Sequence, residues 1–293
     1  MPKFAAKDAN AEFTMEKETP EISEARRKVI ERIREYEAAG IFDRDVEDDP
    51  PTRVLLPNEI EYVKRGLISR IKTRIAFFLA YRFARGQRRA GNLIIKEILG
   101  AENLSGEGGA ILTANHFNPF DSFILQYAFD EAGAKGKLYR VIREGNYTSF
   151  PGFYGFLMRN CNTLPLSSNP ATMKKFLRGT SELIERGNTV LIYAEQSMWY
   201  NYRKPKPLKI GAYQMAVRSG VPIIPAFITM ADSERLDADG LPIQEHTVHI
   251  GKPIFPDLTL PRAERAEKMR DENFAFNREI YESVYGIPLT YES

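Results

Sequence analysis

The feature that most constrains the fold is an alternation of strand-like and helix-like segments that begins near Gly106. Short apolar runs typical of buried strands occur at 110–114, 138–143, 189–193, 223–228 and 247–250. Apolar residues recur at helical spacing at 120–132, 170–186, 209–219 and 262–285. This alternation predicts an α/β fold, with a mixed, mostly parallel sheet flanked by helices.

Size and composition allow such a fold and exclude several other classes of protein. The chain has 293 residues, of which 43% are hydrophobic and 27% are charged, values that fit a globular core and argue against global disorder. The single cysteine, Cys161, rules out an intrachain disulfide and fits a reducing compartment. Residues 1–24 lack the apolar core of a secretory signal, and the apolar run at 75–81 is shorter than the roughly 20 residues of a membrane-spanning helix.

The region ahead of the sheet divides by composition. Ser23 can cap a helix over 24–39, and the acidic, proline-marked stretch 43–51 has the composition of a linker. Residues 1–20 carry no periodic pattern, and we expect them to be poorly ordered. The chain is therefore expected to have three parts: an N-terminal helical or disordered region with the acidic linker (1–57), a basic amphipathic helical segment (58–100) and the α/β domain (101–293).

A strongly cationic segment lies between Lys64 and Lys96. It contains ten basic residues and no Asp or Glu, although the formal net charge of the chain is only +2. Its apolar residues recur at helical spacing and predict a helix from Asn58 to about Phe83 or beyond: Ile68, Ile71, Ile75, Phe78 and Leu79. A cationic, amphipathic helix of this kind either lies in a membrane interface or packs its apolar stripe on the core, and the pattern alone leaves both open.

A histidine and a carboxylate follow the first predicted strand. His116 comes directly after the apolar run 110–114 and Asn115, and Asp121 lies five residues further on. In α/β sheets, active sites form at this end of the strands. A carboxylate that fixed the tautomer of His116 would let the imidazole take a proton from an alcohol near neutral pH. The alternatives are structural, with Asp121 stabilising a helix N-terminus and His116 bonded to a backbone carbonyl.

A second strand-like run, 189–193, is followed by another acidic residue, Glu195. Together, the two strand ends suggest an enzyme that activates a hydroxyl group and transfers a group onto it. His246 and His249 lie three apart on a predicted strand, so their side chains point to opposite faces and do not share a metal. We expect no metal and no organic cofactor, because the sequence contains no motif for either. We also expect no nucleic-acid partner, because no nucleic-acid-binding signature accompanies the basic segment.

Four sequence blocks resemble, in order, those of the glycerolipid acyltransferase family, which contains the lysophosphatidic acid acyltransferases. The blocks, between about Leu104 and Gly251, are Asn115-His116-x4-Asp121, Leu191-Ile-Tyr-Ala-Glu195, Lys209-Ile-Gly211-Ala-Tyr-Gln-Met-Ala216 and Val221-Pro-Ile-Ile-Pro225. The resemblance implies that a fatty acyl group moves from a thioester donor, acyl-CoA or acyl carrier protein, to the hydroxyl of a lysophospholipid such as 1-acylglycerol-3-phosphate.

The same resemblance implies roles for individual residues. His116 would be the general base on the acceptor hydroxyl, and Asp121 would orient it. Glu195 matches the glutamate of the third family motif, which binds the acceptor or organises the site; its alternative is a carboxylate paired with a nearby cation at a strand end. Backbone N–H groups near 195–197 would stabilise the oxyanion.

Two departures from the family pattern put the acceptor in question. The third motif usually reads Phe-Pro-Glu-Gly-Thr-Arg, whereas this chain has Tyr193-Ala-Glu195-Gln-Ser-Met198, and the stretch that matches the second motif, 161–167, also lacks its arginine. Those arginines are the expected phosphate contacts. Another lysolipid, a glycolipid or an amino-lipid therefore stays open as acceptor, and so does a non-catalytic lipid-binding protein.

Glu195, Gln196 and Ser197 are expected to contact the substrates. The missing arginines are expected to be replaced by Arg159 or by a basic cluster after Glu195, for which the alternative is a solvated loop: Arg203, Lys204, Lys206 and Lys209. The aromatic stretch 198–200 would cover an acyl chain or fill core.

The resemblance also favours the membrane interpretation of the cationic segment, because such an enzyme must reach an insoluble acceptor. Basic residues near an anionic leaflet contribute about 1 kcal/mol each. The expected contacts with an anionic membrane surface are Arg70, Arg74, Phe78 and Arg82. The protein is then expected to be cytoplasmic and peripheral on the inner membrane face.

Overall fold

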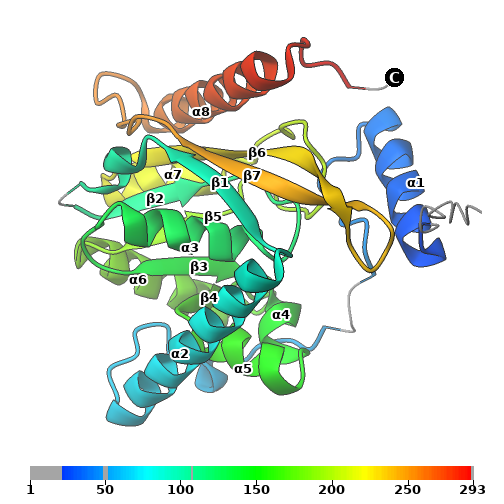
Figure 1. Ribbon diagram of the computed structural model, residues 1–293. Coiled ribbons are helices and arrows are strands. Elements are labelled where there is room, and N and C mark those ends of the chain that lie inside the picture. The colour runs from blue at the N-terminus through cyan, green and yellow to red at the C-terminus, as the bar shows by residue number, and fades with distance from the viewer. Residues whose placement is uncertain (1–21, 49–51, 107, 292–293) are drawn as a thin grey trace, which may run out of the picture.

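The computed structural model describes residues 22–48, 52–106 and 108–291 (Figure 1). The helices are α1 (Glu24–Ala38), α2 (Leu67–Ala90), α3 (Asp121–Glu131), α4 (Glu144–Thr148), α5 (Gly152–Asn160), α6 (Pro170–Glu185), α7 (Gly211–Ser219) and α8 (Arg262–Tyr285), with short 3₁₀ turns η1 (Pro57–Glu59) and η2 (Ala101–Leu104). The strands are β1 (Ile94–Leu99), β2 (Ala110–Thr113), β3 (Leu138–Ile142), β4 (Thr163–Pro165), β5 (Thr189–Ile192), β6 (Ile223–Leu236) and β7 (Pro242–Ile250). Within these ranges, no helix combines the length and the apolar character needed to cross a bilayer.

The strands form one sheet in the order β1-β7-β6-β2-β5-β3-β4. The β6–β7 pair is antiparallel and the other neighbouring pairs are parallel, which confirms the predicted mixed, mostly parallel sheet. The five predicted strands and the four helices predicted beside them are present. Two strands were missed: β1 lies inside the segment predicted to be helical, and β4 is only three residues long. β1 belongs to the sheet although it precedes residue 101, where the α/β domain was expected to begin.

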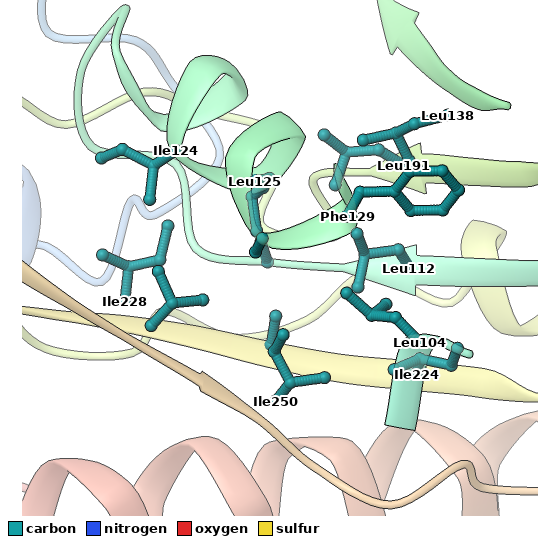
Figure 2. Packing of buried hydrophobic residues seen from close by; sticks show 14 of the residues in the cluster. Leu104, Leu112, Ile124, Leu125, Phe129, Leu138, Leu191, Ile224, Ile228 and Ile250 are labelled. Carbon is teal, nitrogen blue, oxygen red and sulfur yellow. The ribbon is translucent and has the colours of Figure 1, made fainter. Parts of the chain in front are cut away.

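Alternate residues of the strands supply the two faces of the sheet. Leu112 of β2 packs with α3 in one hydrophobic cluster, whose side chains Figure 2 shows between the helix and the strands. Its neighbour Ile111 packs on the opposite face, with α6, α7 and α8. A strand buried on both faces reads as a continuous apolar run, which is why the sequence pattern located β2. The two layers fix the carboxyl ends of β2 and β5 beside each other, with Thr113 paired to Ile192.

The cationic segment differs from its prediction in two ways. Its helix, α2, begins at Leu67 and not at Asn58, because the chain enters it through Gly66 in an extended conformation. Small residues face the protein, since Ala76 and Ala80 pack on Leu157 of α5. The large apolar side chains instead face outward, and the alternative of a stripe packed on the core is wrong for them. These exposed residues are Leu67, Ile68, Ile71, Ile75 and Phe78.

The acidic stretch after α1 is not a linker in its described part. Residues 42–48 pack against the loop that follows β5. The Ser197 hydroxyl donates to Phe42 O at 2.6 Å, and the Trp199 indole donates to Arg44 O at 2.8 Å. Trp199 is fully buried among aromatic and apolar residues of this segment, so it fills core. Residues 1–20, for which we expected poor order, lie outside the described part of the chain.

Asn115 joins the end of β2 to β6. Its side-chain amide donates to Ile228 O at 2.9 Å, and its side-chain oxygen accepts from Ile228 N at 2.8 Å. The side chain therefore completes the backbone pairing of β6 at the point where β2 has ended, and it holds the next residue, His116, in place.

We predict that Asn115→Ala lowers the free energy of unfolding by about 2–4 kcal/mol, because it leaves two buried backbone groups of Ile228 without a partner. Chemical denaturation measures the change. The matched control is Asn92→Ala, which removes an exposed amide and should change stability by less than about 0.5 kcal/mol. Equal stability of the two variants would contradict the role of Asn115.

Candidate active site

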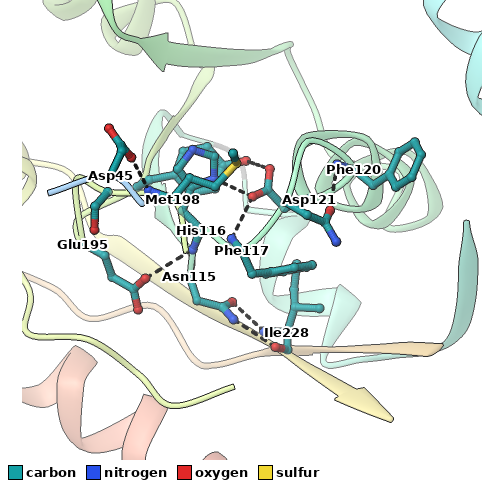
Figure 3. Close-up of polar contacts among 12 residues, drawn as sticks. Asp45, Asn115, His116, Phe117, Phe120, Asp121, Glu195, Met198 and Ile228 are labelled. Carbon is teal, nitrogen blue, oxygen red and sulfur yellow. Dashed lines mark hydrogen bonds and ion pairs between the residues drawn. The ribbon is translucent and has the colours of Figure 1, made fainter. Parts of the chain in front are cut away.

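The imidazole of His116 and the carboxylate of Asp121 face each other at the carboxyl end of β2 (Figure 3). Nδ1 of His116 lies 2.5 Å from Oδ2 of Asp121, which also accepts from Phe117 N at 3.3 Å. Asp121 is buried at the start of α3, whereas the His116 side chain is 25% exposed. The carboxylate is thus directed back to the histidine, and the Phe120 N–H at the helix start is satisfied by the Asn118 side chain instead.

Tyr193 is the third side chain of this cluster. Its hydroxyl donates to Oδ1 of Asp121 at 2.6 Å, and its ring stacks on the His116 ring with 4.1 Å between centroids. Burial, and then the nearby Asp121 carboxylate, raise the pKa of Tyr193 well above its usual value. The hydroxyl therefore remains a donor. We did not predict Tyr193 as a site residue, although its place two residues before Glu195, where the family motif has phenylalanine, was a usable signal.

Glu195 lies beneath the histidine and is 2% exposed. Its carboxylate accepts from His116 N at 3.3 Å and from Lys206 N at 3.0 Å. A large cavity lies beside His116. Its wall, as far as the structure describes it, includes Ala194 and Gln196 but not Glu195. The expected direct contact between Glu195 and substrate is therefore not supported; the carboxylate positions the backbone of His116.

Lys206 supports the same loop from below. Its buried ammonium donates to Ser197 O and Oγ, both at 2.7 Å, and lies 3.5 Å from Oε2 of Glu195. Burial raises the pKa of Glu195 and lowers that of Lys206, and the attraction between the two groups opposes both changes. The loop lacks the glycine and arginine of the family motif, and here a buried lysine holds it.

A cavity of about 1690 Å³ opens beside His116, Asp121 and Tyr193. Most of its wall is apolar. One part is formed by side chains of α2, α3 and α5, including Phe83, and another by side chains of α6 and α7, including Leu177. On the cavity side, Nε2 of His116 makes no hydrogen bond to any described residue, so it is free to take a proton from a bound hydroxyl.

The predicted basic substrate contacts mostly lie elsewhere. Lys209 lines the cavity, but it pairs with Asp43 at 2.9 Å. Arg203 pairs with Asp232 at 2.6 Å, and Lys204 pairs with Glu37 at 2.5 Å. Asp232 and Glu37 lie on segments remote in sequence, and neither Arg203 nor Lys204 belongs to the described wall of the cavity.

Two further predicted contacts are also used for structure. Arg159 donates to Tyr147 O and Phe150 O, each at 3.2 Å, and is absent from the described cavity wall. Ser197 is fully buried.

Gln196 does line the cavity, and it has a positive φ of 68°. Its N–H donates to Tyr193 O at 3.0 Å, so it is not open to an oxyanion as expected.

The remaining histidines have structural partners. Nδ1 of His246 lies 2.8 Å from Ile94 O, and Nε2 of His249 lies 3.0 Å from the Thr229 hydroxyl. In the described parts of the chain, no three His, Cys, Asp or Glu side chains gather as a possible metal site.

Residues 96–229 match the family model described as Acyltransferase. This segment of the chain is therefore similar to the acyltransferase family. The matched segment contains His116, Asp121 and Glu195. No curated protein sequence matches the chain significantly.

Among solved structures, the chain is similar to the 1-acyl-sn-glycerophosphate (LPA) acyltransferase PlsC from Thermotoga maritima. The match has 19% identity over 73% of this chain and 84% of that chain, with a TM-score of 0.45.

We predict that Tyr193→Phe lowers acyl-transfer activity and moves the acid limb of the kcat/KM pH profile to higher pH. The variant keeps the ring on His116 but removes a donor from Asp121, so the carboxylate holds more negative charge and favours the protonated imidazole. Other charged groups near the cluster, Arg140 and Glu195, are unchanged. The measurement is the pH dependence of thioester turnover.

The matched control is Tyr139→Phe, which removes a partly buried hydroxyl on β3 that bonds to no described residue. Its pH profile should coincide with that of the unmodified protein. If Tyr193→Phe also leaves the acid limb in place, the hydroxyl has no part in the site.

Proposed function

We propose that the protein transfers a fatty acyl group from a thioester, acyl-CoA or acyl carrier protein, to the hydroxyl of a lysophospholipid such as 1-acylglycerol-3-phosphate, with His116 as general base. One observation carries the proposal. Nδ1 of His116 is held by the buried carboxylate of Asp121, while the same imidazole borders a large apolar cavity. A base in such a place serves a substrate that is largely hydrocarbon with one reactive hydroxyl.

The reaction needs no covalent acyl-enzyme. Nε2 of His116 takes the proton of the acceptor hydroxyl as its oxygen attacks the thioester carbonyl carbon. The tetrahedral intermediate then loses the thiolate as the carbon–sulfur bond breaks, and the imidazolium returns the proton to the sulfur. Asp121 stabilises the imidazolium and fixes the tautomer that leaves Nε2 unprotonated at the start.

We further propose that the protein works as a peripheral protein on the cytoplasmic face of the inner membrane. The support is the outward stripe of α2, where Leu67 is 74% and Phe78 is 67% exposed. Arg70, Arg74 and Arg82 are exposed on the same helix. Large apolar side chains flanked by arginines fit an anionic interface, and side chains of α2 also line the cavity, so an acceptor could enter directly from the bilayer.

A second acceptor class is favoured by the carboxylates at the cavity wall. Four carboxylates contribute to it, and each is in an ion pair: Asp43 with Lys209, Asp45 with Arg143, Glu47 with Arg26 and Asp48 with Arg32. These carboxylates would repel the negative charge of a phosphomonoester headgroup more than they would repel an amino-lipid, whose amino group is positively charged. A panel of lysolipid, glycolipid and amino-lipid acceptors separates the two classes.

We predict that His116→Ala lowers the rate of thiol release from acyl-CoA in the presence of acceptor by about 10²–10⁴-fold. Asp121→Asn should lose activity to a similar order, because an amide can hold the imidazole in the unproductive tautomer. Thiol release is followed with a chromogenic thiol reagent, and circular dichroism verifies that each variant is folded.

Arg159→Gln is the control for these two variants, since Arg159 lies outside the described cavity wall, and it should retain most of the rate. Turnover of folded His116→Ala near that of the unmodified protein would refute the base assignment. Absence of thiol release from the unmodified protein with every acceptor would identify a lipid-binding protein instead.

We predict that the triple variant Arg70→Glu, Arg74→Glu and Arg82→Glu loses sedimentation with anionic liposomes, because the reversed charges are repelled by the leaflet. Binding of the unmodified protein should also weaken as salt rises. The control reverses three exposed cations on other helices, Arg34, Lys174 and Arg278, and therefore has the same net charge. Equal sedimentation of the two triple variants would contradict the role of α2.

A further inference from the structure

Two arginines of the cavity wall have no partner within the described chain. The basic side chains of the described wall are Arg140, Arg143, Lys209, Arg218 and Arg262. Arg140 donates to Gln126 and to backbone carbonyls, and Arg143 and Lys209 pair with carboxylates. Arg218 and Arg262, both exposed, make no ion pair or side-chain hydrogen bond with any residue that the structure describes. These two guanidinium groups are therefore free to bind an anionic part of a substrate.

The two arginines come from neighbouring helix ends. The Tyr213 hydroxyl, near the start of α7, bonds to Asn273 in the middle of α8. Of the two ends of α8, it is the beginning, with Arg262 and Ala263, that lines the same cavity as Arg218. The end of α7 that carries Arg218 thus lies beside the beginning of α8 that carries Arg262. Both arginines face the same cavity, and together they present two positive charges at one part of its wall.

This basic pair lies at a distance from the histidine. The start of α7 is anchored beside the active-site loop, because Lys209 N donates to Ala194 O at 2.8 Å. From Gly211 to Arg218, the helix rises about 10 Å. The wall between is formed in part by Gln214, Met215 and Val217. A ligand that reaches from His116 to the arginines must therefore be long and flexible, with an anionic group remote from its reactive end.

The place of Arg218 and Arg262 relative to α2 indicates whether they bind the acyl donor or the lipid acceptor. Figure 1 shows α8 at the opposite end of the molecule from the N-terminal part of α2. The cavity is lined by residues of the C-terminal half of α2, where Phe83 packs on α3, and by Arg218 and Arg262 of α7 and α8, which pack on the opposite face of the sheet from α3. If the lipid acceptor enters at α2, as the proposed function has it, the end at α7 and α8 is left for the water-soluble donor.

We infer that Arg218 and Arg262 bind the phosphate groups of a coenzyme A thioester, whose pantetheine arm lies along α7 and brings the thioester to His116. Coenzyme A has the required form: a sulfur at one end, a flexible diamide arm, and a diphosphate and a 3′-phosphate at the other. Arginine matches phosphate through paired N–H donors. The inference deepens the proposed function, because it names the donor and the wall of the cavity that receives it.

Calorimetric titration with coenzyme A and with dephospho-coenzyme A, which lacks the 3′-phosphate, tests the inference without any turnover. The unmodified protein should bind coenzyme A more tightly than the dephospho compound at low salt. The double variant Arg218→Gln/Arg262→Gln should bind coenzyme A about three- to tenfold more weakly, a loss expected for two exposed ionic contacts, and should bind the two compounds nearly alike. Arg278→Gln, the same substitution at an exposed site far along α8, should behave as the unmodified protein does.

The kinetic arm separates donor from acceptor. The KM for acyl-CoA should rise in the double variant by the same factor, with kcat and the KM for the lysolipid unchanged. A rise in the KM for the lysolipid alone would assign the arginines to the acceptor headgroup and overturn the inference. It would also be overturned if the unmodified protein bound no coenzyme A, or if the double variant still preferred coenzyme A to the dephospho compound. If coenzyme A binds as expected but no acceptor is acylated, the donor site stands and the proposed function fails.

Discussion

The buried carboxylate of Asp121 is the group on which the arrangement of the site depends. One oxygen meets the His116 imidazole and the Phe117 N–H, and the other accepts from the Tyr193 hydroxyl. A charged carboxylate that is almost fully buried is tolerated only with several donors, and here they come from the β2 loop and from β5. The carboxylate therefore links two neighbouring strand ends as well as orienting the histidine. Glu195 does the same one layer below, by joining His116 N to Lys206 N.

The sequence was sufficient to predict the α/β class of the fold, five of the strands and the contact between His116 and Asp121, because these features are local in the sequence. His116 and Asp121 are five residues apart across one strand-to-helix turn, so spacing alone could suggest their contact. The juxtaposition with Glu195 followed from parallel strands whose carboxyl ends meet at one edge. Strand β1 was missed because only one strand borders it in the sheet and its residues are mostly part-exposed, leaving no strong pattern.

The prediction that basic residues near Glu195 contact the substrate was less successful, because the ion-pair partners of these residues lie far away in the sequence. Lys204 pairs with Glu37 of α1, and Arg203 pairs with Asp232 of β6. No local sequence pattern predicts either contact. The acidic stretch had the composition of a solvated linker, yet Asp43 and Asp45 neutralise cations at the cavity wall. Burial of Trp199 against residues 42–48 holds this stretch in place, and that packing is a tertiary effect which composition does not encode.

The structure explains how the loop after Glu195 folds without the glycine and the arginine of the family motif. A glycine is missing before Ser197, and the backbone makes the turn with Gln196 at positive φ, a conformation that costs a non-glycine residue about 1 kcal/mol or more. The compensating contacts are the buried Lys206 ammonium on Ser197 and the Asp45 carboxylate on Met198 N. Since these supports use buried or paired charges, they leave no cation on the loop to bind phosphate. Anionic groups of a substrate must then find their partners elsewhere in the cavity, and the part of the wall built by α7 and α8 is where unpaired guanidinium groups remain among the described residues.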